Sequence, residues 1–342
     1  KRSGKKEEDL SSFETTEVIE YKLTGADRYC PDCNTKYKVV TKETVKRLKF
    51  IPARFEVMEE VTFVYSCPKC GAMKRPEKTP SLLKGSVATP SLVAGIMNAK
   101  YVNGMPLARQ EREFARYDLN LSTKTMANWI IQCAGRYLQP LYDLMKEELL
   151  WSKYLHGDET RIQVLDEPDQ KGSTQNWMWV YLTDEYSGSP QMVLFQYERT
   201  RAGYHPAEFL GDQFEGYFTC DGYQAYHSLP GRITVTGCMA HARRRFDEAL
   251  TVLKKDFTKE QLKETTAYQA MERIGMLYKI EEMIRGKSPE ERYEERQKQA
   301  KPLLEAFFEW LHTLEDSVDR SSLIGEAVLY TLNQEIYLKR YL

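Results

Sequence analysis

The sequence has no apolar run near the roughly 18 residues that a membrane span requires, and no charged-then-apolar leader at its start. The first absence excludes a membrane-spanning protein, and the second predicts a cytoplasmic one. Because the first residue is Lys1, we expect the natural start to lie upstream. The net charge is only -1, so any binding of nucleic acid has to come from local basic patches.

Internal repeats and low-complexity tracts are also absent, and 342 residues exceed the usual size of one hydrophobic core. The length alone favours roughly two or three domains. Composition and periodicity divide the chain into five segments. We expect an irregular lead-in over 1–25, a zinc ribbon over 26–80, a helical domain over 81–150, an α/β sheet domain over 151–250 and a helical domain over 251–342.

The seven cysteines are an odd number, which does not suit a secreted disulfide framework. Four of them form two Cys-Pro-x-Cys motifs. Each motif lets two thiolates reach one ion, so we predict a structural Zn²⁺ site made of Cys30, Cys33, Cys67 and Cys70. The intervening text exceeds the roughly 15 to 20 residues common in such sites, so its β-rich parts, 54–57 and 61–65, are expected to form strands. The alternative is four reduced cysteines in a core.

A helix, a short turn and a second helix are predicted between residues 105 and 131. Pro106 begins the first helix, the pattern breaks over 117–121, and Ser122 caps the second. On the second helix, Lys124 and Asn128 share the face opposite the apolar residues, where a recognition helix contacts DNA bases. A three-helix packing unit without DNA binding explains the same text.

From residue 151 the text favours three strands in a meander, followed by alternating helices and strands. The expected strands are Lys153–His156, Trp177–Thr183, Gln191–Tyr197, Gly216–Cys220 and Arg232–Gly237. Helices are expected near Pro206–Leu210, Gly222–Ser228 and Met239–Leu250. This order predicts a mixed sheet with flanking helices, and it matches an RNase H-like core. Cys133, Cys220, Trp177 and Trp179 are interpreted as packing residues.

Two aspartates follow apolar, β-rich runs. Asp158 follows Tyr154-Leu155 on the first expected strand, and Asp221 follows Tyr217-Phe218 on the fourth. Neighbouring strands would bring both carboxylates to one point, which makes a hard oxygen site for Mg²⁺ or Mn²⁺. Two such ions suit in-line phosphoryl transfer on DNA. The alternative is that each aspartate is a strand-end or turn residue, as Asp-Gly often is.

The string that joins the fifth strand to a helix carries His241 near the end of the sheet and three arginines, Arg243, Arg244 and Arg245. The arginines are candidates to hold DNA phosphates. Glu159, beside Asp158, and His241 are candidates to support the active site. The alternatives are a solvated helix face for the arginines and a packing or capping role for His241. Zinc at Cys238 and His241 lacks two further ligands.

Together these strings resemble the transposases of the insertion sequence 66 family. The matching strings are 155–160 (LHGDET), 179–181 (WVY), 221–226 (DGYQAY), 238–246 (CMAHARRRF), 274–281 (IGMLYKIE) and 288–292 (SPEER). The resemblance implies a zinc-finger-like domain, a helical DNA-binding domain and an RNase H-like DDE catalytic domain, which a helical insertion interrupts after the fifth strand. It also implies Mg²⁺-dependent cutting and joining of transposon ends, with Asp158 and Asp221 as the first two acids.

The same resemblance implies the partners: double-stranded DNA, as terminal inverted repeats and as target, and a homodimer or higher homo-oligomer on that DNA in the bacterial cytoplasm. The third acid of the family is a Glu that follows an Asn-Asn pair. This sequence has no such pair, so we expect the third acid beyond residue 342, with Glu326 and Glu335 as alternatives. The competing functions are a DNA-binding regulator with a silent sheet domain and a structure-selective nuclease.

Overall fold

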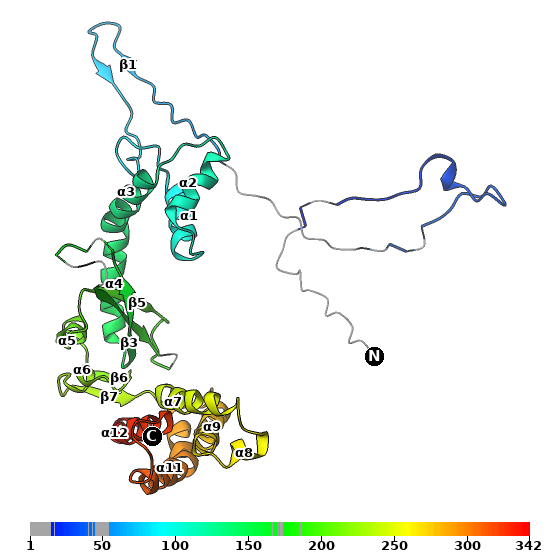
Figure 1. The fold of residues 1–342 in the computed structure, drawn as a ribbon. Coiled ribbons are helices and arrows are strands. Elements are labelled where there is room, and N and C mark those ends of the chain that lie inside the picture. Colours follow the sequence, from blue (N-terminus) through cyan, green and yellow to red (C-terminus); the bar gives the residue numbers. More distant parts are fainter. Residues whose placement is uncertain are drawn as a thin grey trace. The chain divides into compact units, whose positions relative to one another are not determined.

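The computed structural model describes residues 15–16, 18–39, 41–42, 44, 55–165, 167–169, 171, 174–184 and 186–342 (Figure 1). The chain forms two compact units, residues 1–80 with 112–120, and residues 81–111 with 121–342. Most of the predicted lead-in lies outside the described residues, and those of its residues that are described form no helix or strand before Gly25. Within the described ranges, no helix is both long and apolar enough to cross a membrane.

Few of the described residues of 1–80 are in helices or strands. These form a short helical turn, η1 (Gly25–Arg28), and a two-stranded hairpin made of β1 (Tyr65–Ser66) and β2 (Met73–Lys74). The strands predicted at 54–57 and 61–65 were wrong except at Tyr65, because residues 55–64 belong to no strand; Arg54 lies outside the described residues. Val61 and Phe63 are exposed. Alternating apolar residues form a strand only where one face becomes covered.

Four helices precede the sheet in the chain. They are α1 (Pro90–Tyr101), α2 (Leu107–Ala115), α3 (Thr123–Cys133) and α4 (Gln139–Trp151), with a π turn, η2 (Ala134–Leu138), between α3 and α4. The predicted cap is confirmed, because the Ser122 hydroxyl accepts a hydrogen bond from the Thr125 N–H at 3.2 Å. Met126, Trp129 and Ile130 are buried, as the apolar spacing predicts.

A five-stranded mixed sheet follows, as predicted, in the order β5-β4-β3-β6-β7. The strands are β3 (Tyr154–Gln163), β4 (Gln175–Thr183), β5 (Val193–Glu198), β6 (Gly216–Cys220) and β7 (Ile233–Gly237). The first three pair antiparallel, whereas β6 runs parallel to β3 and β7 parallel to β6. The flanking helices are α5 (Tyr204–Leu210), α6 (Gln224–His227) and α7 (Met239–Leu253).

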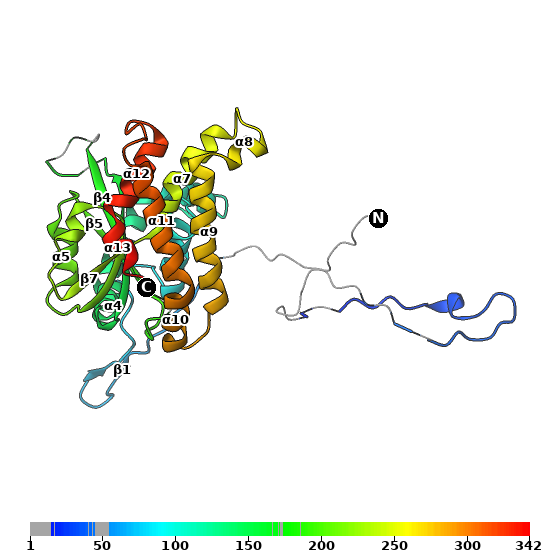
Figure 2. The same cartoon turned by 90° about the horizontal axis from the view of Figure 1, so that it is seen from below.

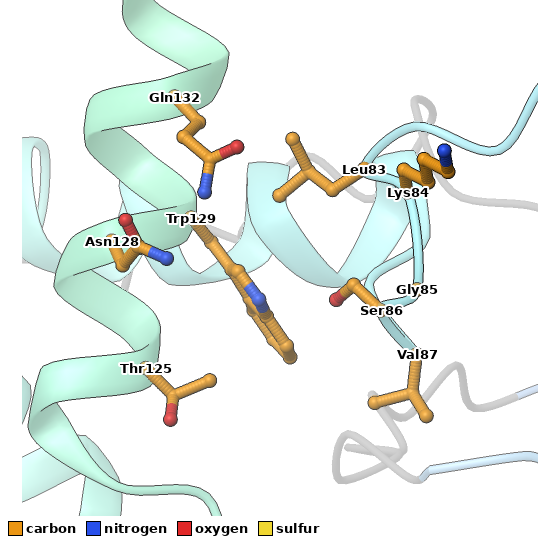
Figure 3. Close-up of a pocket in the computed structure, with 9 residues that line it drawn as sticks. All are labelled: Leu83, Lys84, Gly85, Ser86, Val87, Thr125, Asn128, Trp129 and Gln132. Carbon is orange, nitrogen blue, oxygen red and sulfur yellow. The ribbon is translucent and has the colours of Figure 1, made fainter.

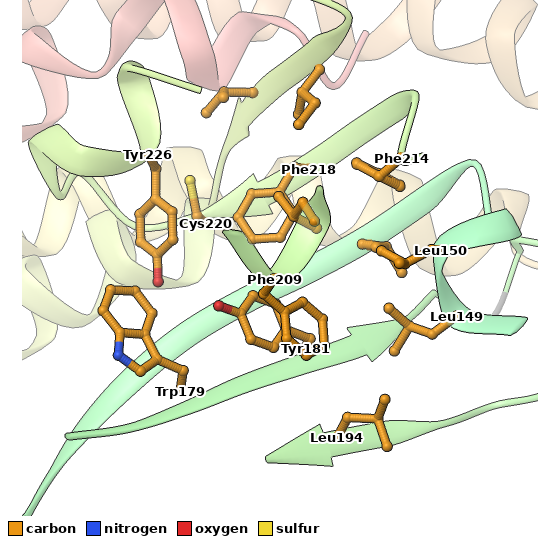
Figure 4. Packing of buried hydrophobic residues seen from close by; sticks show 14 of the residues in the cluster. Leu149, Leu150, Trp179, Tyr181, Leu194, Phe209, Phe214, Phe218, Cys220 and Tyr226 are labelled. Carbon is orange, nitrogen blue, oxygen red and sulfur yellow. The ribbon is translucent and has the colours of Figure 1, made fainter. Parts of the chain in front are cut away.

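Aromatic residues fill the core on one face of the sheet (Figure 4). Tyr181 of β4 stacks on Phe209 of α5, with ring centroids 3.6 Å apart. Phe218 of β6 and Tyr226 of α6 pack beside them, and both are fully buried. Each buried aromatic side chain removes on the order of 150–250 Å² from water, so this cluster anchors α5 and α6 to the strands that carry the two aspartates.

Helices make up the remainder of the chain, as predicted. They are α8 (Lys259–Lys263), α9 (Thr266–Ile284), α10 (Pro289–Glu295), the π turn η3 (Arg296–Ala300), α11 (Lys301–Leu314), α12 (Leu323–Asn333) and α13 (Glu335–Lys339). A second apolar core joins α7, α9, α11 and α12, which lie together in both views (Figures 1 and 2). The predicted helix start at Ser288 is confirmed as a capping box with Glu291.

The chain returns to the sheet at α13. Leu338 packs against Gly237 at the end of β7, where an added Cβ would lie 3.0 Å from the Leu338 nitrogen. Arg340 donates a hydrogen bond to the Val235 carbonyl oxygen at 2.6 Å. The segment predicted as a separate helical domain therefore ends on the sheet, and the five predicted domain boundaries stay predictions.

Candidate active site

The register of the two central strands brings Asp158 and Asp221 to the same level. The parallel ladder between β3 and β6 ends where His156 is opposite Thr219, and each aspartate lies two residues further along its own strand direction. The prediction placed Asp158 just after the end of its strand. It lies instead inside β3, opposite Val180 of β4. The strand is longer than predicted because β4 pairs with it up to Gln163. Asp221 directly follows β6.

His241 lies beside Asp158. Its Nε2 atom is 3.7 Å from the Asp158 Oδ2 atom, and the Asp158 side chain is 49% exposed. The pKa of His241 is raised, chiefly because its ring is hydrogen-bonded to the Cys238 side chain, and the negative charges of Asp158 and Asp221 add to the effect. The charges of both carboxylates therefore favour the protonated form of the His241 ring. Position at the start of α7, directly after β7, explains why His241 reaches this end of the sheet.

The loop after Asp221 is held by α12. The Asp221 Oδ1 atom accepts a hydrogen bond from the Tyr223 N–H at 2.9 Å, and the Gly222 N–H donates to the Tyr330 hydroxyl at 3.1 Å. A Cβ on Gly222 would lie 2.8 Å from the Tyr330 ring, so only glycine fits here. Burial, and then the charge of Asp221, raises the pKa of Tyr330 to about 12. The turn geometry that was the alternative interpretation of Asp221 is present, and one of its carboxylate oxygens takes part in it.

Glu159 points to the opposite face of β3 from Asp158, because side chains alternate along a strand. Its side chain is 1% exposed and forms an ion pair with Arg201. The Arg201 Nε atom donates to Glu159 Oε1 at 2.8 Å, and the Tyr226 hydroxyl donates to Oε2. Burial raises the pKa of Glu159, although Tyr226 and Arg201 oppose that shift. Glu159 therefore faces the protein interior. Sequence reasoning missed Arg201, since a loop arginine carries no local signal.

The two alternatives for a third acid lie elsewhere. Glu335 is engaged with His312 at 2.9 Å and with Lys339, and Glu326 is exposed on α12. Within the described part of the chain, no group of three or more His, Cys, Asp or Glu side chains has a metal-binding arrangement. Neither glutamate therefore joins Asp158 and Asp221.

The three arginines lie on the second turn of α7 and are exposed. The Arg245 guanidinium stacks on the Tyr330 ring, 4.1 Å from its centroid. Arg243 lines a shallow hollow with Ala240, Gly275 and Tyr278. The arginines share α7 with His241, so their positive charge lies on the helix that begins beside Asp158.

Lys124 and Asn128 are both exposed on α3, as predicted. Asn128 lines an open hollow between α3 and the segment 83–87, together with Thr125, Trp129 and Gln132 (Figure 3). The side chains of α3 in this view point toward that segment, and three of them end in hydroxyl or amide groups. Such groups can donate to and accept from base edges or phosphates.

The two Cys-Pro-x-Cys motifs form equivalent turns. The Asn34 N–H donates to the Cys30 carbonyl at 2.8 Å, and the Gly71 N–H donates to the Cys67 carbonyl at 2.8 Å. Asn34 and Gly71 have φ values of 53° and 73°, which the tight turn requires. Hydrogen bonds from the backbone of Asp32 and Cys33 lower the pKa of Cys30 to about 7, and those of Cys70 and Lys69 lower that of Cys67. Thiolates are the form that binds zinc, so each turn offers two suitable ligands, but the structure does not bring three or more of these four described cysteines into one metal-binding group.

Comparison with known proteins agrees with these features. Residues 85–342 match the family model described as Transposase IS66 family. Residues 27–71 match the model described as the zinc-finger binding domain of transposase IS66. The first match covers more than half of the chain, which therefore belongs to the IS66 family of transposases. The mixed sheet thus lies within the match to the transposase family model, and the two Cys-Pro-x-Cys turns lie within the match to the zinc-finger model.

Curated relatives occur in Sinorhizobium fredii (strain NBRC 101917 / NGR234). The chain is 29% identical over 319 residues to the uncharacterized protein y4hP, a match that covers 89% of the chain and 57% of the relative. It is 28% identical over 321 residues to the uncharacterized protein y4jD, covering 89% of the chain and 60% of the relative. The chain thus spans about three-fifths of the length of these relatives.

Proposed function

We propose that this chain binds the terminal inverted repeats of a transposon and takes part in metal-dependent cleavage and transfer of DNA strands. The observation that carries the proposal is the register of β3 and β6, which supports Asp158 and Asp221 as neighbouring carboxylates at the end of a parallel ladder. Membership of the transposase family supports the same assignment. Under this proposal residues 151–250 form an RNase H-like catalytic domain.

In this proposal Asp158 and Asp221 hold Mg²⁺ or Mn²⁺, for which carboxylate oxygens are the preferred ligands. The bound ion would activate the attacking oxygen and stabilise the leaving oxygen of a phosphodiester. Asp158 is half-exposed, its Oδ1 atom accepts a hydrogen bond from the Glu159 N–H at 2.9 Å, and its Oδ2 atom faces His241 and could bind a ligand. His241 keeps its proton to higher pH than an ordinary histidine and lies where it can stabilise charge on Asp158.

A third carboxylate belongs to this proposal. The family pattern puts it after an Asn-Asn pair that the sequence does not contain, and the curated relatives are longer than this chain. We infer that it is supplied from outside the 342 residues. The engagement of Glu335 with His312 and Lys339 supports that inference over the alternative.

DNA contacts are assigned to two surfaces. Lys124 and Asn128 on α3 would contact the terminal repeats, and Arg243, Arg244 and Arg245 on α7 would hold phosphates close to the cleaved bond. Zn²⁺ bound by Cys30, Cys33, Cys67 and Cys70 would order the first unit. The active assembly would be a homodimer or a higher homo-oligomer on the DNA.

The deciding experiment uses a form long enough to contain the whole catalytic domain and a plasmid that carries the terminal repeats. Asp158→Ala and Asp221→Ala should each abolish cleavage and strand joining while leaving repeat binding unchanged. Asp212→Ala is the matched control, because Asp212 is a fully exposed aspartate that pairs with Arg232. Cleavage by either mutant would show that these are not the catalytic acids.

Two other outcomes would replace the proposal. Repeat binding without cleavage in the wild type, with any divalent metal, would indicate a DNA-binding regulator. Nicking of branched DNA that lacks terminal repeats, without strand joining, would indicate a structure-selective nuclease.

A further inference from the structure

Arg201 and Glu159 form an ion pair that is not part of the proposed catalytic set, and in it the Glu159 side chain is 1% exposed and the Arg201 side chain 38% exposed. Arg201 lies in the loop between β5 and α5, and its Nε and Nη2 atoms both donate to Glu159 Oε1. The Tyr226 hydroxyl donates to the other oxygen, so the carboxylate has a donor on each oxygen. Because desolvation of the buried carboxylate offsets the attraction, such a pair is weak evidence for stability. The role of the pair is therefore inferred from the other residues that Arg201 contacts.

The same arginine contacts the loop that carries Asp221. The Arg201 guanidinium lies 3.9 Å from the centre of the Tyr223 ring, and the Tyr223 hydroxyl donates to the Arg201 carbonyl oxygen. The Tyr223 N–H in turn donates to Asp221 Oδ1 at 2.9 Å. Burial lowers the pKa of Arg201, but the hydrogen bond and charge of Glu159 and the charge of Asp221 raise it above its ordinary value. Arg201 thus interacts electrostatically with Glu159 on β3 and with Asp221 after β6.

The residues that Arg201 contacts come after the last paired residues of β3 and β6. The paired residues of β3 and β6 end at His156 and Thr219, one step before the level of Gly157 and Cys220. Glu159 is bonded to Asp158 in the chain, and Tyr223 is two residues after Asp221. Arg201 therefore contacts the side chain of the residue after Asp158 and the ring of the residue two positions after Asp221.

We propose that Arg201, through Glu159 on one side and Tyr223 on the other, is a positioning residue that fixes the separation of Asp158 and Asp221. The inference rests on the proposed function, since it concerns the same metal site. We call Arg201, Glu159 and Tyr223 the clamp. Partners that orient metal ligands are worth about 10- to 100-fold in metal affinity, which sets the size of the expected effect.

The test is a Mn²⁺ titration, followed by electron paramagnetic resonance, of a form long enough to contain the whole catalytic domain, with thermal unfolding recorded for every variant. Arg201→Met should weaken Mn²⁺ binding about 10- to 100-fold. Tyr223→Phe, which removes one hydroxyl and keeps the ring, should weaken it about 2- to 10-fold. Glu281→Gln is the matched control, because Glu281 pairs with Arg296 through two bonds, of 2.9 and 2.7 Å, in the helical region. It should bind Mn²⁺ as the wild type does.

A positioning role also predicts coupling. In an Asp221→Ala background, Arg201→Met should cause no further loss of Mn²⁺ affinity, because there is no longer a separation to fix. An equal further loss would overturn the clamp, since it would show that Arg201 acts through general stability. If Arg201→Met does not fold, Tyr223→Phe decides, and unchanged binding in that variant overturns the clamp.

The outcomes separate the clamp from the proposed function. Loss of Mn²⁺ in Asp158→Ala together with wild-type affinity in a folded Arg201→Met variant would overturn the clamp alone. A wild-type form with the whole catalytic domain that binds no Mn²⁺, or an Asp158→Ala variant that binds it as well as the wild type, would overturn the metal site and the clamp with it.

Discussion

The ring of Phe218 lies directly against Gly157, so that a Cβ built on Gly157 would come within 2.2 Å of the Phe218 Cζ atom. Gly157 precedes Asp158 in β3, and Phe218 is a fully buried residue of the neighbouring strand β6. Contact of this closeness fixes the path of β3 just before the proposed metal ligand. The glycine in the matching string of the family is thus explained by packing.

We predict that Gly157→Ala destabilises the fold by about 1–3 kcal/mol, because the ring of Phe218 or the strand has to move. Urea unfolding of the purified chain measures the change. Gly275→Ala is the control, since Gly275 lies within α9 and an added Cβ would meet nothing within 4 Å. That variant should gain about 0.5–1 kcal/mol. Equal stability of Gly157→Ala and the wild type would contradict the packing described.

Asp184 gives a prediction for pH. Its Oδ2 atom is 2.9 Å from His156 Nε2, and this hydrogen bond is the main reason why its pKa is lowered. A carboxyl whose pKa is lower in the folded than in the unfolded chain contributes stability above its unfolded pKa, near 3.9, and loses it as the pH falls through its folded pKa.

Asp184→Asn should therefore reduce the free energy of unfolding by about 1 kcal/mol at pH 6 and by progressively less as the pH falls below about 4. Denaturant titrations between pH 3 and pH 7 measure the difference from the wild type. Asp212→Asn, which changes a fully exposed aspartate, should show no comparable pH dependence. A difference that stays constant with pH would show that Asp184 does not act through its charge.

The cysteine turns predict the zinc content of the protein. Chain purified without chelator should contain about one zinc ion, and Cys30→Ser or Cys67→Ser should remove it, because a Cys₄ site needs all four thiolates. Elemental analysis by mass spectrometry measures the content. Cys238→Ser should retain the ion, since Cys238 is the N-cap residue of α7 and belongs to neither Cys-Pro-x-Cys turn. Zinc loss in that variant instead would place the ion elsewhere.

The face of α3 predicts two different effects on DNA binding. Lys124→Ala should weaken binding similarly for all sequences and reduce the slope of log affinity against log salt by about 1, as the loss of one phosphate contact does. Asn128→Ala should reduce discrimination between the terminal repeat and unrelated DNA by about 1–3 kcal/mol. Fluorescence anisotropy at several salt concentrations measures both. Lys259→Ala, on α8, is the control and should change neither.

The sequence predicted much of the sheet, because its signals are local. The strands predicted from runs of apolar residues lie close to the observed strands. The order of strands and helices followed from the spacing of these runs along the chain. Ser122 and Ser288 were predicted as caps from the residues that follow them. Each hydroxyl accepts a hydrogen bond from a backbone N–H in the first turn of its helix. The burial of Trp179, Cys133 and Cys220 likewise followed from their position in apolar text.

The features that were missed depend on contacts between distant segments. β3 extends past Asp158 only because β4 pairs with it, and nothing in the polar text after Asp158 signals that pairing. Arg201 meets Glu159 from a loop 42 positions away, and Tyr330 meets Gly222 from 108 positions away. The roles of Asp158, Asp221 and the four cysteines as metal ligands stay predictions, as do the DNA contacts of Lys124, Asn128 and the arginines.

The return of the chain to β7 has a consequence for assembly. β7 is the last strand in the order of the sheet, and an open last strand can pair with the strand of another molecule. Here Arg340 donates to the Val235 carbonyl, and Leu338 lies on Gly237, so α13 covers this edge. Growth of the sheet from one molecule to the next is hindered on this side. In the proposed assembly on DNA, copies of the protein would have to join through surfaces other than β7.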